Sequence, residues 1–305
     1  MPSLVVALLA VALQQARPDS IVAVAKETLR PLADTVALHK AGYFSIGFGG
    51  NTKDLSPFQG QHWLAVRRWL ANEPAPLDKP FFVLYLPVRD SMIPIGVAHA
   101  EKITGNTQPR TELAGMAAEW HIHVVCRGIP GEGQVILDGV ENCLERGGDP
   151  APNRISMVHT WTVPNPDGPF AHDNPALPFI ATGLKPPTQF TRDDRLFAIA
   201  LGESYGARLM LGALIERYAT AAGKETKLAA YRSTIRDITR DLVAAEHAGD
   251  PKRYATDKQR ILATWQQLVD EYHAAALTPQ IRTQFDLELE SMLGAEHHHH
   301  GSSSF

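Results

Sequence analysis

The chain has 305 residues, of which 44% are hydrophobic and 20% are charged, and its formal net charge is −4. A mildly acidic chain without a basic run does not have the charge pattern of a nucleic-acid-binding protein. The length is sufficient to bury a full core, so one large or two smaller globular domains are expected.

The N-terminal segment has the pattern of a secretory signal. Residues 4–13 form the uncharged apolar run LVVALLAVAL, which is too short to span a bilayer, and residues 10–12 resemble a cleavage site. We therefore expect residues 1–16 to be a signal peptide and the protein to be periplasmic or secreted. Because Met1 to Ser3 contain no lysine or arginine, a buried N-terminal helix is the alternative.

Residues 19–40 have apolar side chains at helical spacing, with Asp19 and Ser20 in the position of caps and Gly42 after the last turn. Pro31 interrupts this pattern and is expected to kink or split the helix.

A glycine-rich turn is predicted at residues 47–50, and His62 and Trp63 are predicted to begin a second short helix. The glycines are not followed by the Gly-Lys-Ser/Thr sequence of a phosphate-binding loop. Nucleotide binding is therefore not expected.

The middle of the chain changes to short strands. Runs of β-branched and aromatic residues, bounded by Pro, Gly, Asn or Asp, cover residues 80–88, 92–100, 120–126 and 155–163. Helical segments do not clearly separate all of these runs, so the sheet is expected to be mixed or antiparallel.

The last third of the chain is predicted to be helical. Residues 191–293 have helical periodicity with breaks near Gly223, residues 249–251 and Pro279, which predicts three or four helices. The fold class is therefore α+β, with a mixed or antiparallel sheet, an N-terminal helix and a C-terminal helical region.

We assign residues 17–190 to an α+β domain and residues 191–293 to a helical region packed on it. Residues 294–305 contain four consecutive histidines and resemble a disordered tag; a native metal-scavenging tract is the alternative. In an exported protein Cys126 and Cys143 can close one disulfide, and two buried thiols are the alternative.

Histidines are concentrated between residues 121 and 172. Because side chains alternate along a strand, His121 and His123 lie on the same face. His159 lies on a later predicted strand, and the Pro-Asp-Gly turn before His172 can fold that residue back toward it. Imidazole groups in this arrangement are suitable ligands for zinc, copper, iron or nickel.

The predicted metal site therefore consists of these four histidines, with His62 as a weaker fifth ligand. Asp173, Glu119 or His99 can complete the ligand shell. The alternative is that the histidines are hydrogen-bonded core residues.

Two segments carry a resemblance to a known group of proteins. The sequence AGYFSIGFGG...GQHW, followed by VHTWTVPNPDGPFAHDNP, resembles a family of exported bacterial proteins of unassigned function, over residues 35–180 at most. The resemblance implies export and a site shared by His62 and His159. The matching positions are Gly42, Tyr43, His62, His159, Trp161, Asn165, Pro166, Gly168, Phe170, Asn174 and Pro175.

A competing motif is GESYG at residues 202–206, which fits a serine nucleophile elbow with Ser204 as nucleophile. LFAIAL before it can be a strand, and the residues after it are helical. However, the downstream chain shows helical periodicity instead of further strands, and His247 and His273 lie in helical patterns.

One continuous amphipathic helix, capped near Thr191, is the stronger interpretation of this region. In such a helix Glu203 can face the histidine-bearing sheet.

The sequence thus predicts an exported transition-metal-binding protein whose cofactor is zinc, copper or iron. If it is an enzyme, Glu119, Glu203 or Asp173 can serve as base for a small-molecule substrate at a metal with an open position. A carrier or structural site would be coordinatively closed. A serine hydrolase acting through Ser204, and a non-catalytic binding module with a proline-rich docking loop, are the alternatives.

Overall fold

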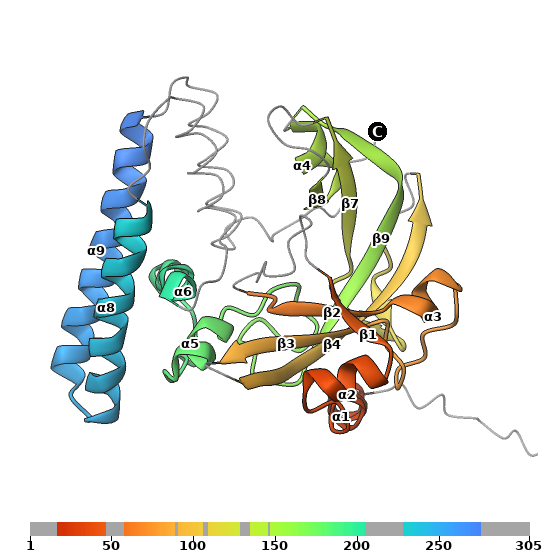
Figure 1. Ribbon diagram of the computed structural model, residues 1–305, viewed down its shortest axis with the longest axis horizontal. Helices are drawn as coiled ribbons and strands as arrows, with labels where there is room; N and C mark the ends of the chain where they lie inside the picture. Colours follow the sequence, from red (N-terminus) through yellow and green to blue (C-terminus); the bar gives the residue numbers. More distant parts are fainter. Residues whose placement is uncertain are drawn as a thin grey trace, which may run out of the picture.

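The computed structural model describes residues 17–46, 58–88, 91–105, 109–128, 135–145, 147–204 and 228–275. Within these ranges the protein is α+β, as predicted, with helices packed around an antiparallel sheet (Figure 1). The predicted signal peptide, the glycine-rich turn, the breaks at Gly223 and Pro279 and the histidine-rich tail lie outside the described residues.

The main sheet contains seven strands in the order β1-β2-β3-β4-β9-β7-β8, and each of these pairs is antiparallel. The four predicted strand segments correspond to β3, β4, β7 and β9. The strands are β1 (Tyr43–Ile46), β2 (Gln61–Ala65), β3 (Phe82–Val88), β4 (Ser91–Thr104), β7 (His121–Arg127), β8 (Val135–Asp138) and β9 (Asp149–Trp161). A separate ribbon is formed by β5 (Glu112–Leu113) and β6 (Met116–Ala117).

His62 and Trp63 lie in strand β2, so the prediction that they begin a helix is wrong. His62 is opposite Ile46 of β1 and opposite Leu84 of β3. Because β2 lies between two strands and is largely buried on both faces, its sequence lacks the polar alternation that identifies a half-exposed strand. The short helix, α3 (Val66–Leu70), follows directly after it.

The two faces of the sheet are covered by different elements. Helices α1 (Pro18–Leu29) and α2 (Thr35–Lys40) cover one face, where Ala25 and Leu38 share a buried cluster with Val83 and Val97. Pro31 splits these two helices, as predicted, and Asp34 caps α2 by accepting the Ala37 N–H at 2.8 Å.

The opposite face carries a second cluster of large buried side chains. A cluster of Phe82, Leu84, Met157 and Trp161 packs there against Leu177 of helix α5 (Leu177–Thr182). Burial of such side chains contributes about 1.5–3 kcal/mol each before the entropic cost of ordering them. This face therefore has a closely packed apolar layer, against which polar side chains can be held in fixed positions.

Three helices of the C-terminal region pack together beside the sheet (Figure 1). They are α6 (Arg192–Ser204), α8 (Leu228–His247) and α9 (Pro251–Ala275), and the predicted break at residues 249–251 separates α8 from α9. Their core includes Trp265 and also Phe58 and Phe179, which come from the α+β region. Among the helices within the described ranges, none combines the length and apolar character that crossing a membrane requires.

Cys126 and Cys143 form a disulfide bond, which decides between the two alternatives left open by the sequence. The bond joins β7 to helix α4 (Val140–Glu145), with the two Cα atoms 5.6 Å apart. Both residues are completely buried in a small cluster with Val124 and Leu137. The disulfide therefore anchors the strand that carries His121 and His123 to helix α4.

Candidate functional site

Strands β7 and β9 place three histidines on one face of the sheet. His121 is opposite Met157, and His123 is opposite Ile155, in the antiparallel ladder. Since residues two positions apart on a strand share a face, the side chains of His121, His123 and His159 project from the same side. The ring centres of His121 and His123 are 4.7 Å apart, which confirms the prediction that these two side chains share a face.

Two further histidines complete the cluster from other parts of the chain. His62 of β2 brings its Nε2 atom to 3.3 Å from Nε2 of His159, although the two residues are 97 positions apart. His172, in the loop after β9, has its ring centre 3.9 Å from that of His121 and 5.7 Å from that of His159. All five histidines singled out from the sequence thus lie together, and they are called the histidine cluster below.

Four of the five histidines in the cluster are buried and His121 is partly buried, and this burial changes their protonation. His62, His123 and His159 are 3% exposed or less, and His172 is 9% exposed. Burial, reinforced by the neighbouring rings of His62 and His172, lowers the pKa of His159 well below its ordinary value of 6.5. The pKa of His121 is lowered in the same way by burial and by three neighbouring imidazoles. Both rings are therefore neutral at neutral pH and retain one nitrogen lone pair each.

The proline-rich loop after β9 is held in shape by its two asparagines. Asn165 accepts the backbone N–H of Asp167 at 3.0 Å and donates to the Asp173 carbonyl at 2.8 Å. Asn174 donates to the Pro164 carbonyl at 3.1 Å and accepts the Ala176 N–H at 3.0 Å. These bonds replace the backbone pairing that the prolines exclude, so the loop presents His172 in a defined position.

The loop also fixes the proton position on His159. Nδ1 of His159 lies 2.6 Å from the backbone carbonyl oxygen of His172, which can only accept a hydrogen bond. Nδ1 of the neutral ring therefore carries the proton, and the lone pair is on Nε2, the atom that faces His62. This is the arrangement found for metal-binding histidines, in which the second nitrogen is oriented by a carbonyl or carboxylate.

Gln59 is part of the site although nothing in the sequence drew attention to it. Its amide nitrogen donates to Oδ1 of Asp173 at 2.9 Å and lies 2.8 Å from Nε2 of His172. Glu119 accepts the backbone N–H of His172 at 3.0 Å. Two of the predicted catalytic carboxylates, Glu119 and Asp173, thus lie at the His172 side of the cluster. A single loop glutamine has no periodicity or motif from which its position could have been predicted.

His99 does not belong to the cluster, and its predicted role in completing the ligand shell is wrong. On β4 it is opposite Val158, whereas its neighbour Ala98 is opposite His159. Its side chain therefore projects to the other face of the sheet, which helix α1 covers. Burial alone lowers the pKa of His99 to about 4.

The region of the serine motif forms a helix before Ser204. Residues 192–204 are helical, including the segment LFAIAL, so the strand that a nucleophile elbow requires is not formed. The helix begins with a capping box, because Thr191 accepts the Asp194 N–H at 3.1 Å and Asp194 accepts the Thr191 N–H at 3.0 Å. The side chains of Glu203 and Ser204 lie outside the described part of the structure.

The described donor atoms of the histidine cluster approach one another in pairs. Besides the His62 and His159 pair, Nε2 of His121 lies 3.0 Å from Nε2 of His123. No three His, Cys, Asp or Glu side chains within the described ranges are already placed to hold one ion. A shared site therefore requires the two pairs to move toward a common centre.

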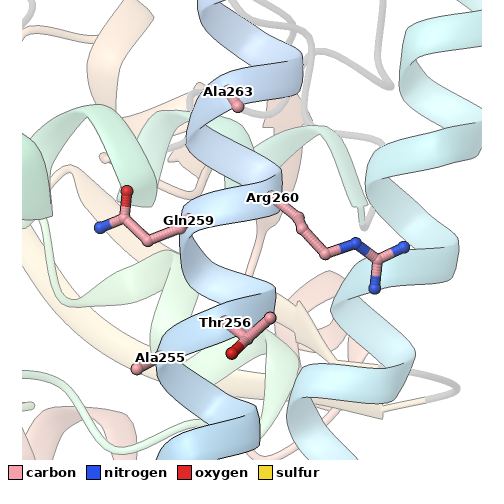
Figure 2. A pocket seen from close by; sticks show the side chains of 5 residues that line it. All are labelled: Ala255, Thr256, Gln259, Arg260 and Ala263. Carbon is pink, nitrogen blue, oxygen red and sulfur yellow. The ribbon is translucent and has the colours of Figure 1, made fainter.

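A shallow open hollow lies elsewhere, along helix α9. It is lined by Ala255, Thr256, Gln259, Arg260 and Ala263, whose side chains are seen in Figure 2. Arg260 donates to Asp257 at 2.7 Å. The five lining residues include no histidine, carboxylate or thiol.

The chain was also compared with known proteins. No family model, no curated protein and no solved structure matches it significantly. The interpretation of the histidine cluster therefore rests on its own residues and geometry.

Proposed function

We propose that the histidine cluster binds a transition-metal ion such as zinc, copper or iron. The observation that carries this proposal is the presence of two pairs of Nε2 atoms, one buried and 3.3 Å apart and the other part-buried and 3.0 Å apart, on one face of the sheet. Two nitrogens bound to one tetrahedral zinc at the usual bond length are roughly 3.3–3.4 Å apart. The existing spacing of each pair therefore suits two ligands of one ion.

The two pairs are also close to each other. The ring centres of His121 and His159, which belong to different pairs, are 5.0 Å apart. Rings that share a tetrahedral ion are separated by roughly 5 Å, since each ring centre lies about 3.2 Å from the ion. Rotation of the imidazoles about their side-chain torsions is the movement that would bring the four Nε2 atoms to one centre.

We propose further that the protein acts outside the cytoplasm. The disulfide between Cys126 and Cys143 supports this, because such bonds persist in oxidising compartments. If the bound ion has an open coordination position, the carboxylates of Glu119 and Asp173 are the bases available to activate its water. A closed ligand set would instead make the protein a carrier or a structural metal protein.

Elemental analysis by mass spectrometry tests the proposal. The chain with the tail histidines His297 to His300 changed to alanine is purified without a nickel column, because the tail itself can bind metal. We expect about one equivalent of one transition metal per chain, and its loss in a His62→Ala/His159→Ala variant. If the tail variant retains no metal after incubation with zinc, copper or iron salts and dialysis, the proposal is wrong.

A further inference from the structure

We infer that His172 is a positioning residue rather than a metal ligand, and that it prepares His159 for coordination through its backbone carbonyl. This inference rests on the proposed function for the identity of the bound group. It divides the histidine cluster into two classes. His62, His121, His123 and His159 are the ligands, and His172 orients one of them.

The first observation is the contact between the His172 carbonyl and His159. The carbonyl oxygen lies 2.6 Å from Nδ1 of His159 and accepts its proton. Nε2 of His159 then carries the lone pair in the direction of His62. The contact uses the main chain of His172, so it survives removal of the imidazole.

The second observation is that the ring nitrogen of His172 is already bound. The amide nitrogen of Gln59 lies 2.8 Å from Nε2 of His172 and 2.9 Å from Oδ1 of Asp173. The carboxylate requires a donor at this position, which fixes the orientation of the Gln59 amide, and Nε2 of His172 must therefore accept. A nitrogen that accepts a hydrogen bond cannot offer the same lone pair to a metal.

The third observation is that His172 is held from several sides. Its backbone N–H donates to Glu119 at 3.0 Å, and the loop after it is attached to the segment before β2 by the Asn174 N–H, which donates to the Phe58 carbonyl at 2.9 Å. The ring of His172 also stacks on that of His159, with an angle of 14° between the planes. The orientation of His159 is therefore determined by the loop that contains His172, and hydrogen bonds to other parts of the chain hold this loop in place.

Nuclear magnetic resonance of the full chain labelled with ¹⁵N tests the first part of the inference. The pattern of couplings in each imidazole identifies the protonated nitrogen. We expect His159 to carry its proton on Nδ1 and His172 to have an unprotonated Nε2. A proton on Nε2 of His159 would overturn the inference, whether or not the protein binds metal.

Metal binding by variants tests the second part. In the background with alanine at His297 to His300, His172→Ala keeps the carbonyl that orients His159 and is expected to bind Zn²⁺ less than about tenfold more weakly, below the range for losing a supporting group. Its Co²⁺-loaded form should keep the visible absorption spectrum of the unsubstituted site. His159→Ala should lose Co²⁺ binding.

A changed Co²⁺ spectrum in His172→Ala, or a loss of ion as complete as in His159→Ala, would show that His172 is a ligand and overturn the inference. If the unsubstituted site binds no Co²⁺ or Zn²⁺, the proposed function fails and the metal-ligand assignment fails with it. The proton positions then still decide whether His172 orients His159.

Discussion

Buried histidines have different surroundings on the two faces of the central sheet. On the face covered by helix α1, His99 is buried and lies opposite Val158. On the other face, one residue along the same two strands, His159 lies opposite Ala98 and contacts His62 and His172. Burial lowers the pKa of both histidines, but only His159 is affected by the charges of other imidazoles.

The difference shows that burial alone does not identify a binding site. His99 and His159 are of one residue type, on adjacent strands of one sheet, and both are at most 5% exposed. What distinguishes His159 is a second imidazole nitrogen 3.3 Å away and a carbonyl that fixes its proton. His99 is therefore a matched control within the same chain for experiments on the histidine cluster.

The largest expected effect is on metal affinity. In the background with alanine at His297 to His300, His159→Ala should weaken Zn²⁺ binding more than about 100-fold, beyond the range expected for a supporting residue. His99→Ala should change the affinity by less than about threefold, because its side chain is on the other face. Competition with a calibrated chelator measures both constants. Equal losses of Zn²⁺ affinity in the two variants would contradict the prediction that only the face carrying His159 binds the metal.

The disulfide provides the next largest effect. Its residues are 17 positions apart, and a disulfide that closes a loop of about this length stabilises the folded protein by about 3 kcal/mol. A Cys126→Ala/Cys143→Ala variant should lose about this much free energy of unfolding in urea, yet retain its bound metal. Loss of the metal in a variant that remains folded would mean that the disulfide also positions His121 and His123.

The contribution of His99 to the free energy of unfolding should depend on pH. His99 has a pKa of about 4 in the folded protein, compared with 6.5 when unperturbed, so the unfolded chain binds a proton first as the pH falls. The penalty is absent above about pH 7, reaches about 2 kcal/mol at pH 5 and levels off below pH 4. A His99→Leu variant should lack this component when urea unfolding is followed at pH 7 and pH 5. An identical pH dependence in both proteins would show that His99 is not buried as described.

The smallest expected effect concerns the loop over the histidine cluster. Asn174→Ala removes two hydrogen bonds of a buried side chain, to the Pro164 carbonyl and from the Ala176 N–H, and should cost about 1–2 kcal/mol. Asn153→Ala, at an exposed position of β9, should change the free energy of unfolding by less than about 0.5 kcal/mol. Thermal unfolding of the two variants makes the comparison. Equal stability of the two would show that the loop does not depend on Asn174.

The fold could be predicted where the signal is local. Strands β3, β4, β7 and β9 were visible as β-branched and aromatic runs, and the split at Pro31 followed from the geometry of proline. Strand β2 was predicted as a helix start, because a strand buried on both faces has no alternation to identify it.

The candidate site could be predicted only in part, for a related reason. The common face of His121 and His123 follows from a period of two within one strand. Whether His99 or His62 joins them depends on the register between strands, which long-range pairing determines. Gln59 enters the site through contacts with residues more than a hundred positions away, and no pattern in the sequence encodes them.

The central claim is that one metal ion is bound by the histidine cluster. Anomalous X-ray diffraction at the absorption edge of the bound metal tests it most directly, using crystals of the chain with alanine at His297 to His300. The account predicts one peak about 2.0–2.3 Å from Nε2 atoms of His62, His121, His123 and His159, with His172 outside bonding distance. Crystals soaked in zinc that show no peak between these rings would contradict it.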